Sequence, residues 1–321
     1  MPRSALPTVD IAMATYNGAP YLDDMLDSIA AQTHSNMRLF VSDDGSSDGT
    51  LAVIARHAGA LDITQLPSTP RKGVLRNFET ALAATSAPYV ALCDQDDFWL
   101  PDKLALLQSR LSDLEALHGR DFPLLVFSDI EVVDSRLARL KPSMYQQSIK
   151  SAGARTFADY FFSSHVPGCA MMVNRALLDL ALPFPAVEIH DWWLIQLATL
   201  FGKIDYVDRP LIKYRQHAGN AIGLGGAAGN PWLGRLQKLA SPLTFLDKRR
   251  TKWRQQVVAI RKALLALDGF GPALPETGRH FVEAGLTHPD AARLKRLLAG
   301  AKAGEWPLDQ RAIIHLLGRP G

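Results

Sequence analysis

Short apolar runs alternate with helical patterns through the first half of the chain. Runs rich in β-branched and other apolar residues predict four strands, at Val9–Ala14, Arg38–Ser42, Ile63–Leu66 and Tyr89–Leu92. Between them, apolar residues recur at helical spacing and predict helices at Tyr21–Ala31, Gly49–His57 and Leu75–Ala84. Strands that alternate with helices in this way are typical of a mostly parallel sheet with crossover helices. The pattern therefore predicts an α/β fold with a Rossmann-like central sheet.

The alternation continues less regularly to about residue 220. Pro101–Leu117 predicts an amphipathic helix with proline in its first turn. Further patterns predict a helix at Asp191–Phe201 and strands at Leu124–Val133, Ala170–Val173, Ile204–Val207 and Leu211–Tyr214. A Gly-rich stretch over 218–231 breaks the pattern, and the chain beyond it becomes helical and basic, notably at Leu243–Leu267. We expect an α/β domain over 1–220 and a helical C-terminal extension over 221–321.

The composition fits a cytoplasmic protein with a large core. Of 321 residues, 47% are hydrophobic. The apolar runs are all shorter than the ~20 residues that a membrane-spanning helix needs. The first residues, Met1–Ala5, lack the apolar segment of a signal peptide. Two cysteines, Cys93 and Cys169, provide no disulfide framework and fit a reducing compartment. We therefore expect a cytoplasmic location.

Charge is distributed unevenly along the chain. From Pro231 to the end there are 16 Lys and Arg against 7 Asp and Glu, a net charge of +9, whereas the whole chain carries +3. Residues 1–230 therefore carry −6, which argues against nucleic acid as the main ligand. The basic C-terminal helices expected beyond residue 231 fit either packing on the α/β domain or peripheral contact with an anionic inner membrane.

An acidic cluster follows the predicted strand Tyr89–Leu92. Asp94, Asp96 and Asp97 place three carboxylates within four positions, where a buried strand gives way to a loop. Like charges this close repel one another, so the cluster favours a bound cation. Oxygen ligands suit a hard ion, Mg²⁺ or Mn²⁺, which commonly bridges to a substrate diphosphate. The alternative is an acidic cap for the helix that starts near Pro101, a role that one Asp would fill.

Three other polar clusters follow predicted strands, at Thr15–Gly18, Asp43–Thr50 and Gly73–Asn77. The carboxyl ends of parallel strands meet at one edge of a sheet, where a nucleotide would bind. Tyr16 could stack on a base, Asp44 could accept from a base N–H, and Arg76 could pair with phosphate. Each assignment has a structural alternative, since Asp43–Gly45 also fits a turn and Tyr16 a rim aromatic. Their joint placement predicts a nucleotide site.

The sequence motifs resemble those of family-2 glycosyltransferases, inverting enzymes of the GT-A fold that use a nucleotide-activated sugar. The segments that carry this resemblance are Val9–Gly18, Ser42–Thr50 and Asp94–Asp97. Two later segments, His190–Trp193 and Tyr214–His217, resemble motifs of a bacterial rhamnosyltransferase-like subset. The resemblance covers roughly residues 8–220, with the motifs in the family's order.

The resemblance implies a hexosyltransferase that moves a sugar from a dTDP- or UDP-sugar to a saccharide or lipid-linked oligosaccharide in bacterial surface polysaccharide (O-antigen) assembly. It divides the domain into a donor-binding half to about residue 100 and an acceptor half over 101–220. It implies that Asp94 and Asp96 form a DxD motif for Mn²⁺ or Mg²⁺ and that Asp191 is the catalytic base. The expected donor-binding residues are Thr15, Tyr16, Asn17, Asp44, Arg76, Asp94 and Gln95.

Chemical reasoning about Asp191 leaves two roles open. Inverting displacement at an anomeric carbon needs a carboxylate that takes the acceptor proton, separate from those that hold a metal. Asp191 lies among His190, Trp192 and Trp193, which could desolvate it and present apolar faces to a sugar. The alternative is that Asp191 N-caps the helix that follows it.

Two further positions also have alternatives. His217, near the end of a predicted strand, either completes the metal shell or touches the diphosphate, or is a structural histidine. Gly168 is either a close approach of backbone to the acceptor, beside Trp192 and Trp193, or a turn into a strand.

Two rival functions fit a sheet of this kind. A nucleotidyltransferase that makes sugar nucleotides also combines an α/β sheet with an acidic metal motif. Such enzymes usually carry a basic Gly-rich loop after the first strand, whereas Thr15–Pro20 has no basic residue. A non-catalytic GT-A binding subunit is the other rival, and the presence of both the acidic cluster and Asp191 argues against it.

Overall fold

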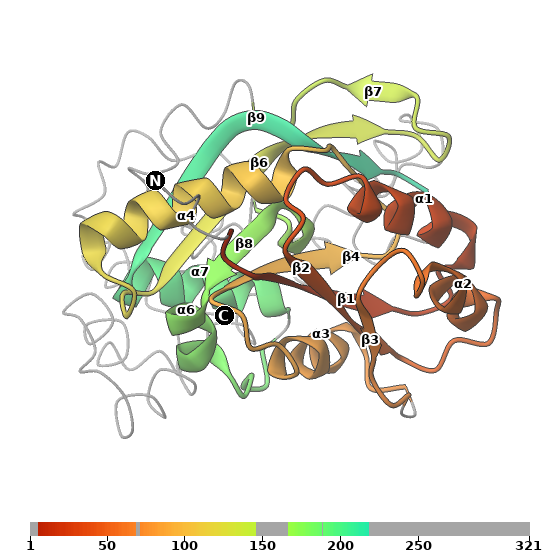
Figure 1. The fold of residues 1–321 in the computed structure, drawn as a ribbon, viewed down its shortest axis with the longest axis horizontal. Coiled ribbons are helices and arrows are strands. Elements are labelled where there is room, and N and C mark those ends of the chain that lie inside the picture. Colours follow the sequence, from red (N-terminus) through yellow and green to blue (C-terminus); the bar gives the residue numbers. More distant parts are fainter. Residues whose placement is uncertain (1–5, 69–70, 146–165, 188, 218–321) are drawn as a thin grey trace, which may run out of the picture. The chain divides into compact units, whose positions relative to one another are not determined.

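The structure, a computed structural model, describes residues 6–68, 71–145, 166–187 and 189–217. Four parallel strands form its N-terminal half, in the order β3-β2-β1-β4 (Figure 1). Their bounds are β1 Val9–Thr15, β2 Met37–Asp43, β3 Ile63–Gln65 and β4 Tyr89–Asp94. The connecting helices are α1 Ala19–Ala30, α2 Thr50–His57 and α3 Val74–Ala83. The sequence prediction of alternating strands and helices is confirmed here, with ends shifted by one or two residues.

The C-terminal half continues the same sheet in the order β4-β8-β6-β9-β5. Its strands are β5 Phe98–Trp99, β6 Leu124–Val133, β8 Met171–Asn174 and β9 Lys203–Arg215, and the short β7 Arg139–Lys141 pairs with β6. Strand β8 runs antiparallel to both of its neighbours, whereas β9 runs parallel to β6. The sheet is therefore mixed, and the predicted α/β class is confirmed.

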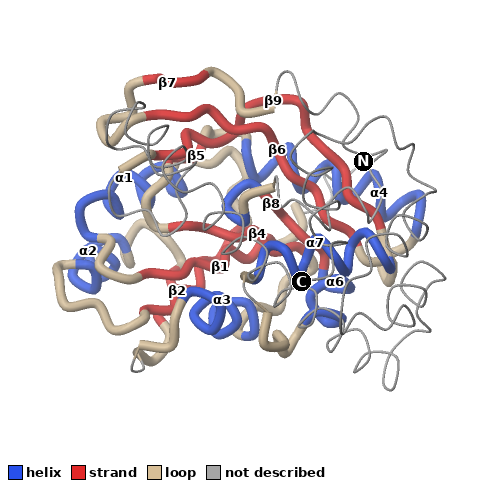
Figure 2. Tube along the Cα trace, turned by 180° about the vertical axis from the view of Figure 1, so that it is seen from behind, coloured by secondary structure: helices blue, strands red, loops and turns tan. Residues whose placement is uncertain are grey.

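Helices cover both faces of this sheet (Figures 1 and 2). Helix α4, Lys103–His118, packs on β6, β8 and β9 from one side. Helices α6, Arg175–Ala181, and α7, His190–Phe201, pack on each other and on the other side of β6. Strands buried on both faces are apolar along their whole length rather than at alternate positions. That is why Ile11, Val90 and Val126 all lie in the core.

Several elements differ from the sequence prediction. Ile204–Val207 and Leu211–Tyr214 belong to a single strand, β9, whose register with β6 is irregular where Asp129 faces Pro210. Proline has no N–H to donate, so the apolar pattern breaks there although the strand continues. Strand β5 has two residues and β7 reads Arg-Leu-Lys, so neither shows a strand pattern. Helix α6 is also too short for a periodic signal.

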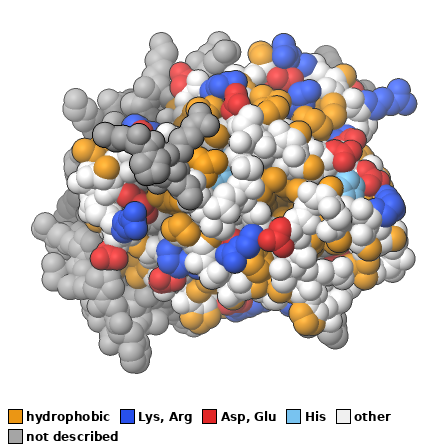
Figure 3. Space-filling model, in the orientation of Figure 1, with side chains coloured by type: hydrophobic (Ala, Val, Ile, Leu, Met, Phe, Trp, Pro, Cys, Tyr) orange, Lys and Arg blue, Asp and Glu red, His pale blue; other side chains and the backbone are white. Residues whose placement is uncertain are grey.

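All the elements named above belong to one compact unit that ends at Arg215. A second unit comprises residues 155–163, 185–188 and 216–321, most of which lie outside the described residues. The predicted Gly-rich loop and the basic C-terminal helices fall there. Among the described residues, each helix is too short or too polar to cross a membrane. On the face drawn in Figure 3, the acidic and basic side chains of the described residues are interspersed.

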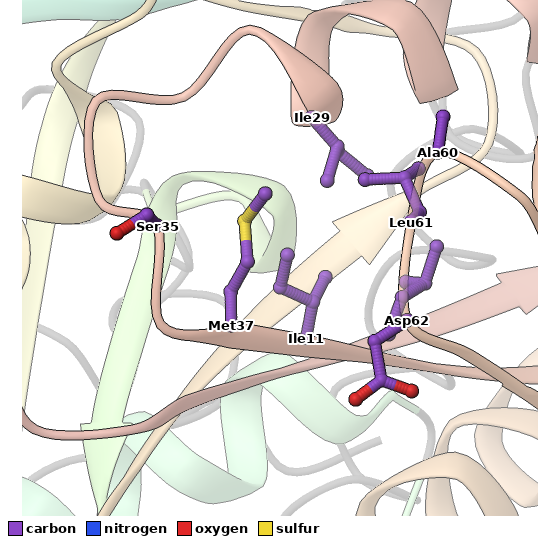
Figure 4. Close-up of a pocket in the computed structure, with 8 residues that line it drawn as sticks. Ile11, Ile29, Ser35, Met37, Ala60, Leu61 and Asp62 are labelled. Carbon is purple, nitrogen blue, oxygen red and sulfur yellow. The ribbon is translucent and has the colours of Figure 1, made fainter.

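A small hollow of about 160 Å³ lies beside the first halves of β1 and β2 (Figure 4). Its lining includes Ile11, Met37, Leu61 and Asp62, with Ile29 at the end of α1. It is away from the carboxyl ends of these strands, where the sequence places the polar clusters. None of the predicted site residues lines it.

Candidate active site

The carboxyl ends of β1, β2 and β4 bring three polar residues side by side. In the strand register Thr15 faces Asp43, and Ala14, one residue earlier, faces Asp94. The Thr15 hydroxyl donates to Asp43 Oδ2 at 2.8 Å, and the Asp44 N–H donates to the Thr15 carbonyl at 2.9 Å. The polar clusters after these three strands therefore share one edge of the sheet, as the order of the strands predicts.

The segment after β1 is braced by the acidic loop. Gln95 Oε1 accepts from the Tyr16 N–H at 2.8 Å, and Gln95 Nε2 donates to the Tyr16 carbonyl at 3.0 Å. A β-carbon at Gly18 would collide with the Gln95 side chain, so glycine allows this close approach. The amide of Gln95 thus positions the Tyr16 backbone. The expected contacts of Gln95 and Tyr16 with the donor stay predictions.

Asn17 links the first two loops of this edge. It has φ 47°, in the left-handed region that asparagine tolerates better than most residues. Its side-chain oxygen accepts from the Ser47 N–H at 2.9 Å, and its own N–H donates to Ser46 Oγ at 2.8 Å. These bonds hold the loop after β1 against the loop after β2, on the side where a nucleotide is expected.

Asp44 and Tyr16 both contact the segment that precedes α3. The buried Asp44 carboxylate accepts from the N–H groups of Lys72, at 2.7 Å, and Gly73, at 3.0 Å. The Arg71 guanidinium lies over the Tyr16 ring, 4.2 Å from its centroid. A carboxylate has about four acceptor positions, so two bonds leave Asp44 able to accept from a base.

Arg76, in the first turn of α3, already bonds two other groups. Its guanidinium donates to Glu79 at 2.5 Å and to the Phe184 carbonyl at 2.8 Å. Its side chain is 41% exposed, so part of it faces solvent. The expected pairing of Arg76 with phosphate stays a prediction. It requires the guanidinium to bind phosphate while it still donates to Glu79.

The three carboxylates of the acidic cluster have different surroundings. Asp94 and Asp96 are partly exposed, whereas Asp97 is fully buried and accepts from the Arg215 N–H at 3.1 Å. Burial, followed by the charge of Asp96, raises the pKa of Asp94 to about 7 and also raises the pKa of Asp97 well above its ordinary value. The cluster therefore disfavours full ionisation unless a cation is present.

The donor set fits a hard divalent cation held by Asp94 and Asp96, whose carboxylates are partly exposed. Ligand atoms of Asp94, Asp97 and Cys169 lie within 4.8 Å of one another, but this trio is a poor match for such an ion. Burial raises the pKa of the Cys169 thiol well above its ordinary value, so it stays protonated. A protonated thiol is a weak ligand, and sulfur suits softer metals. His217 belongs to the other compact unit, and its role as a ligand stays a prediction.

Asp191 lies in the first turn of α7 and is 9% exposed. Ile189 occupies the N-cap position of this helix, without a side-chain cap bond, so Asp191 is not its N-cap. The Asp191 carboxylate accepts from the Trp192 N–H at 2.6 Å and from the Gly168 N–H. Burial raises its pKa to about 7, and its charge in turn raises that of Asp94. The two carboxyl groups therefore lie within electrostatic reach of each other.

Gly168 lies in a short 3₁₀ turn, η2 (Gly168–Ala170), against the side chain of His190. A β-carbon at this position would be 2.8 Å from His190 Nε2, so glycine is needed for the turn to approach. The His190 ring stacks on Phe78, with centroids 3.9 Å apart, and burial lowers its pKa to about 3. Gly168 thus positions Asp191, and its expected acceptor contact stays a prediction.

The two tryptophans after Asp191 differ in exposure. Trp193 is buried and its indole N–H donates to the Ala181 carbonyl at 3.1 Å, so it packs between α7 and α6. Trp192 is partly exposed. Of the two, Trp192 is the one with surface to offer a sugar.

The sequence patterns do not reveal two buried cations beside the acidic cluster. The Lys103 ammonium is fully buried, 3.4 Å from the centroid of the Trp99 ring. Arg215, the last residue of β9, is 2% exposed. Charged residues at the start of a helix and the end of a strand ordinarily face solvent. The one available signal for Arg215 was its place inside the Tyr214–His217 motif.

Comparisons with known proteins agree with this arrangement. The model of the family described as "Glycosyl transferase family 2" matches residues 10–179. The dTDP-rhamnosyl transferase RfbG of Shigella flexneri is 29% identical over 226 residues, covering 66% of this chain and 73% of its own. The Escherichia coli glucosyltransferase WfgD, named as acting with UDP-Glc on α-D-GlcNAc-diphosphoundecaprenol, is 27% identical and covers 58% of this chain and 67% of its own.

Two solved structures share the fold. Residues 1–349 of S. aureus TarS in complex with UDP-GlcNAc align with a TM-score of 0.55 at 14% identity, over 97% of this chain and 79% of that one. The mannosyltransferase PcManGT from Pyrobaculum calidifontis, in complex with GDP-Man and Mn²⁺, aligns with a TM-score of 0.53 at 19% identity, over 98% and 80%.

Proposed function

Because this chain belongs to glycosyl transferase family 2, we propose that it moves a sugar from a nucleotide-diphosphate donor to a saccharide or lipid-linked acceptor, with inversion at the anomeric carbon. The observation that supports the proposal is that an acidic pair and a separate buried carboxylate lie near each other. Asp94 and Asp96 form a partly exposed acidic pair at the end of β4, and Asp191 lies within electrostatic reach in a separate buried position.

A dTDP- or UDP-sugar is the proposed donor. RfbG is named for a dTDP-sugar, WfgD for UDP-Glc, and the TarS structure holds UDP-GlcNAc. Thymine and uracil both present an N–H between two carbonyls, which suits the acceptor positions that Asp44 retains. Tyr16 offers an aromatic face beside it, with Arg71 on that ring. A rhamnosyl donor is the narrower proposal, supported by the name of RfbG.

Asp94 and Asp96 would hold a divalent cation, Mn²⁺ or Mg²⁺. When bound, such an ion neutralises the charge that develops on the diphosphate leaving group. The PcManGT complex contains Mn²⁺, which supports the assignment. Changing Asp96 to Ala should abolish the metal-dependent transfer while the protein stays folded, since this carboxylate is partly exposed. Full activity of the unmodified protein in EDTA would contradict the metal role.

Asp191 is the proposed general base. Its carboxylate is fixed by the N–H groups of Trp192 and Gly168, so it can point at one acceptor hydroxyl. A pKa of about 7 lets the carboxylate be ionised at neutral pH while still taking a proton effectively. An acceptor bound against the exposed part of Trp192 would present its hydroxyl to this group.

The acceptor is proposed to be a glycan or a lipid-linked oligosaccharide at the inner membrane. The name of WfgD specifies a diphosphoundecaprenol-linked sugar, which supports a lipid-linked class. The basic segment from Pro231 onward would attract an anionic leaflet, where such an acceptor resides. This proposal places the enzyme in surface polysaccharide assembly.

A donor screen tests the function directly. The purified chain is incubated with dTDP-, UDP- and GDP-sugars and Mn²⁺, and released nucleotide products are measured. Slow release of nucleoside diphosphate from one donor class is the expected result. Pyrophosphate release from a nucleoside triphosphate and a sugar phosphate would instead indicate a nucleotidyltransferase. Neither product, with thermal stabilisation by a nucleotide sugar, would indicate a binding subunit.

A further inference from the structure

Arg215 joins three separate segments around the acidic loop. Its guanidinium is 2% exposed and donates from Nε to the Asp96 carbonyl at 2.8 Å. It also donates from Nη1 to the Ser135 carbonyl at 2.7 Å and from Nη2 to Asp24 Oδ2 at 2.9 Å. One side chain thus connects the loop after β4, the turn after β6 and helix α1.

The same residue holds the loop a second time through its backbone. The Arg215 N–H donates to Asp97 Oδ1 at 3.1 Å, next to the peptide whose carbonyl accepts from the guanidinium. Strand β5 begins directly after Asp97 and pairs antiparallel with β9. Asp96 and Asp97 are therefore fixed to the end of β9 by a side-chain bond, a backbone bond and the start of a strand pair.

Burial makes these bonds consequential. A guanidinium taken out of water destabilises the fold unless its donors are satisfied, and losing a single partner of a buried charge is strongly destabilising. The exposed pair between Arg56 and Asp23 is the opposite case, because solvent can replace each partner. The buried Arg215 side chain therefore fixes its partners in place, and its most direct contact with the acidic loop is the bond to the Asp96 carbonyl.

We infer that Arg215 is a positioning residue for the cation site, holding the Asp96 backbone so that its carboxylate is oriented before the ion arrives. The inference rests on the proposed function, in which Asp94 and Asp96 hold Mn²⁺ or Mg²⁺. Arg215 contacts the main chain of Asp96, the proposed metal ligand, and not the ion itself. Groups that orient metal ligands from behind change metal affinity by about 10–100-fold when removed.

The test compares Arg215→Gln with Arg56→Gln, a matched loss of one guanidinium at an exposed pair. Binding of Mn²⁺ in the presence of UDP or dTDP is measured by calorimetry. We expect Mn²⁺ binding to be at least about 10-fold weaker in Arg215→Gln. The Mn²⁺ affinity of the control variant should be unchanged. Hydrogen exchange in EDTA should be faster at residues 94–100 of Arg215→Gln, and high Mn²⁺ should restore part of its transfer activity.

Equal Mn²⁺ affinity in Arg215→Gln and the unmodified protein would overturn the inference, whatever the change in thermal stability. If Arg215→Gln does not fold, Asp24→Asn removes the charge of the exposed carboxylate that pairs with Arg215. This variant should also weaken Mn²⁺ binding. An unmodified protein that binds no Mn²⁺ with any nucleotide would contradict the proposed metal use itself. That outcome is distinct from a failure of Arg215 alone.

Discussion

Burial of ionisable groups sets the chemistry of single residues at this edge of the sheet. Desolvation raises the pKa values of Asp94 and Asp191 to about 7 and lowers that of His190 to about 3. His190 is therefore neutral at physiological pH and adds no charge beside Asp191. The carboxyl groups, in contrast, sit where a small change of environment alters their ionisation.

Replacing Asp191 by Asn tests its role as the base. Asparagine preserves size and can still accept from the Trp192 N–H, so the fold and donor binding should survive. Turnover should fall by at least ~10²-fold, the lower range for loss of a general base. Steady-state rates and thermal shift with the donor measure the two effects. Unchanged turnover would exclude Asp191 as the base, and loss of folding would assign it a structural role.

The same substitution should alter the pH dependence of stability. Asp191 has a pKa of about 7 in the folded chain against 3.8 as the ordinary value, so the folded state binds the proton more tightly. The contribution of Asp191 to the free energy of unfolding is therefore greatest below about pH 4 and is lost as the pH rises toward 7. Denaturation of metal-free protein across this range should show a shallower fall in stability for Asp191→Asn. Parallel curves for the two proteins would contradict the raised pKa.

Gly168→Ala tests the close packing beside the base. The new β-carbon would meet His190 Nε2 at 2.8 Å, so the turn or the His190 ring must shift, and Asp191 with it. Misplacement of a catalytic group by about 1 Å can cost 10²-fold, so we expect kcat to fall by up to ~100-fold with the KM for donor little changed. Gly59→Ala is the control, because its β-carbon would meet no atom within 4 Å. Equal kcat in both variants would refute the packing argument.

At the scale of elements, the strands were largely predictable because their burial requires continuous apolar runs. The first and last residues of β6 agree with the sequence prediction, and β1, β2 and β4 extend it by one or two residues, the last of which is polar in each strand. Those polar residues, such as Asp43 and Asp94, belong to the site, since hydrogen bonding continues past the apolar run. The joining of two predicted strands into β9 depends on tertiary pairing with β6, which no local pattern encodes.

The candidate site was predictable only where residue type and strand end coincide. Asp94, Asp96 and Asp191 follow from chemistry and motif, and their neighbourhood follows from the order of the strands. Buried Arg215 and Lys103 do not, because whether a charged side chain is buried depends on which distant segments surround it. The burial of Trp193 likewise follows from the packing of α6 on α7, and α6 was not predicted.

Asp10 gives an element-scale prediction, because it connects β1, β2 and the turn that leads into β4. It is fully buried and accepts from Arg38 and from the N–H groups of Ser86 and Ala87. Asp10→Ala should destabilise the fold by about 3 kcal/mol, the lower end for a broken buried pair, since Arg38 can regain water. Asp23→Ala, at an exposed pair with Arg56, should change stability by less than ~1 kcal/mol. Urea denaturation compares them, and equal losses would contradict the argument.

At the scale of the whole molecule, the two ends of the chain differ in charge. Residues 1–230 carry −6 and the remainder carries +9. The described part of the chain contains the sheet edge with its proposed donor and base residues. The basic residues from 231 onward belong to the other unit and lie outside the described residues.

Vesicle sedimentation of the full chain tests the proposed attraction to an anionic membrane. Five basic residues lie between Lys248 and Arg254, and each contributes about 1 kcal/mol near an anionic surface. We expect weak binding to vesicles with anionic lipid that is lost at high salt, and none to neutral vesicles. Changing Lys248, Arg249 and Arg250 to Gln should abolish it. Binding that is insensitive to salt and lipid charge, or no binding at low salt, would instead assign this segment a packing role.

The contact between Arg215 and the acidic loop also has a consequence for biosynthesis. The two partners are 118 and 119 residues apart in sequence, so the loop leaves the ribosome long before the residue that holds it. Strands β1 to β4 can pair as soon as they emerge, because their contacts are closer in sequence. The acidic loop can be locked only after β9 has been translated. A nascent chain interrupted before that point would contain strands β1 to β4, with the proposed donor-binding residues, but would lack the contact that holds the acidic loop.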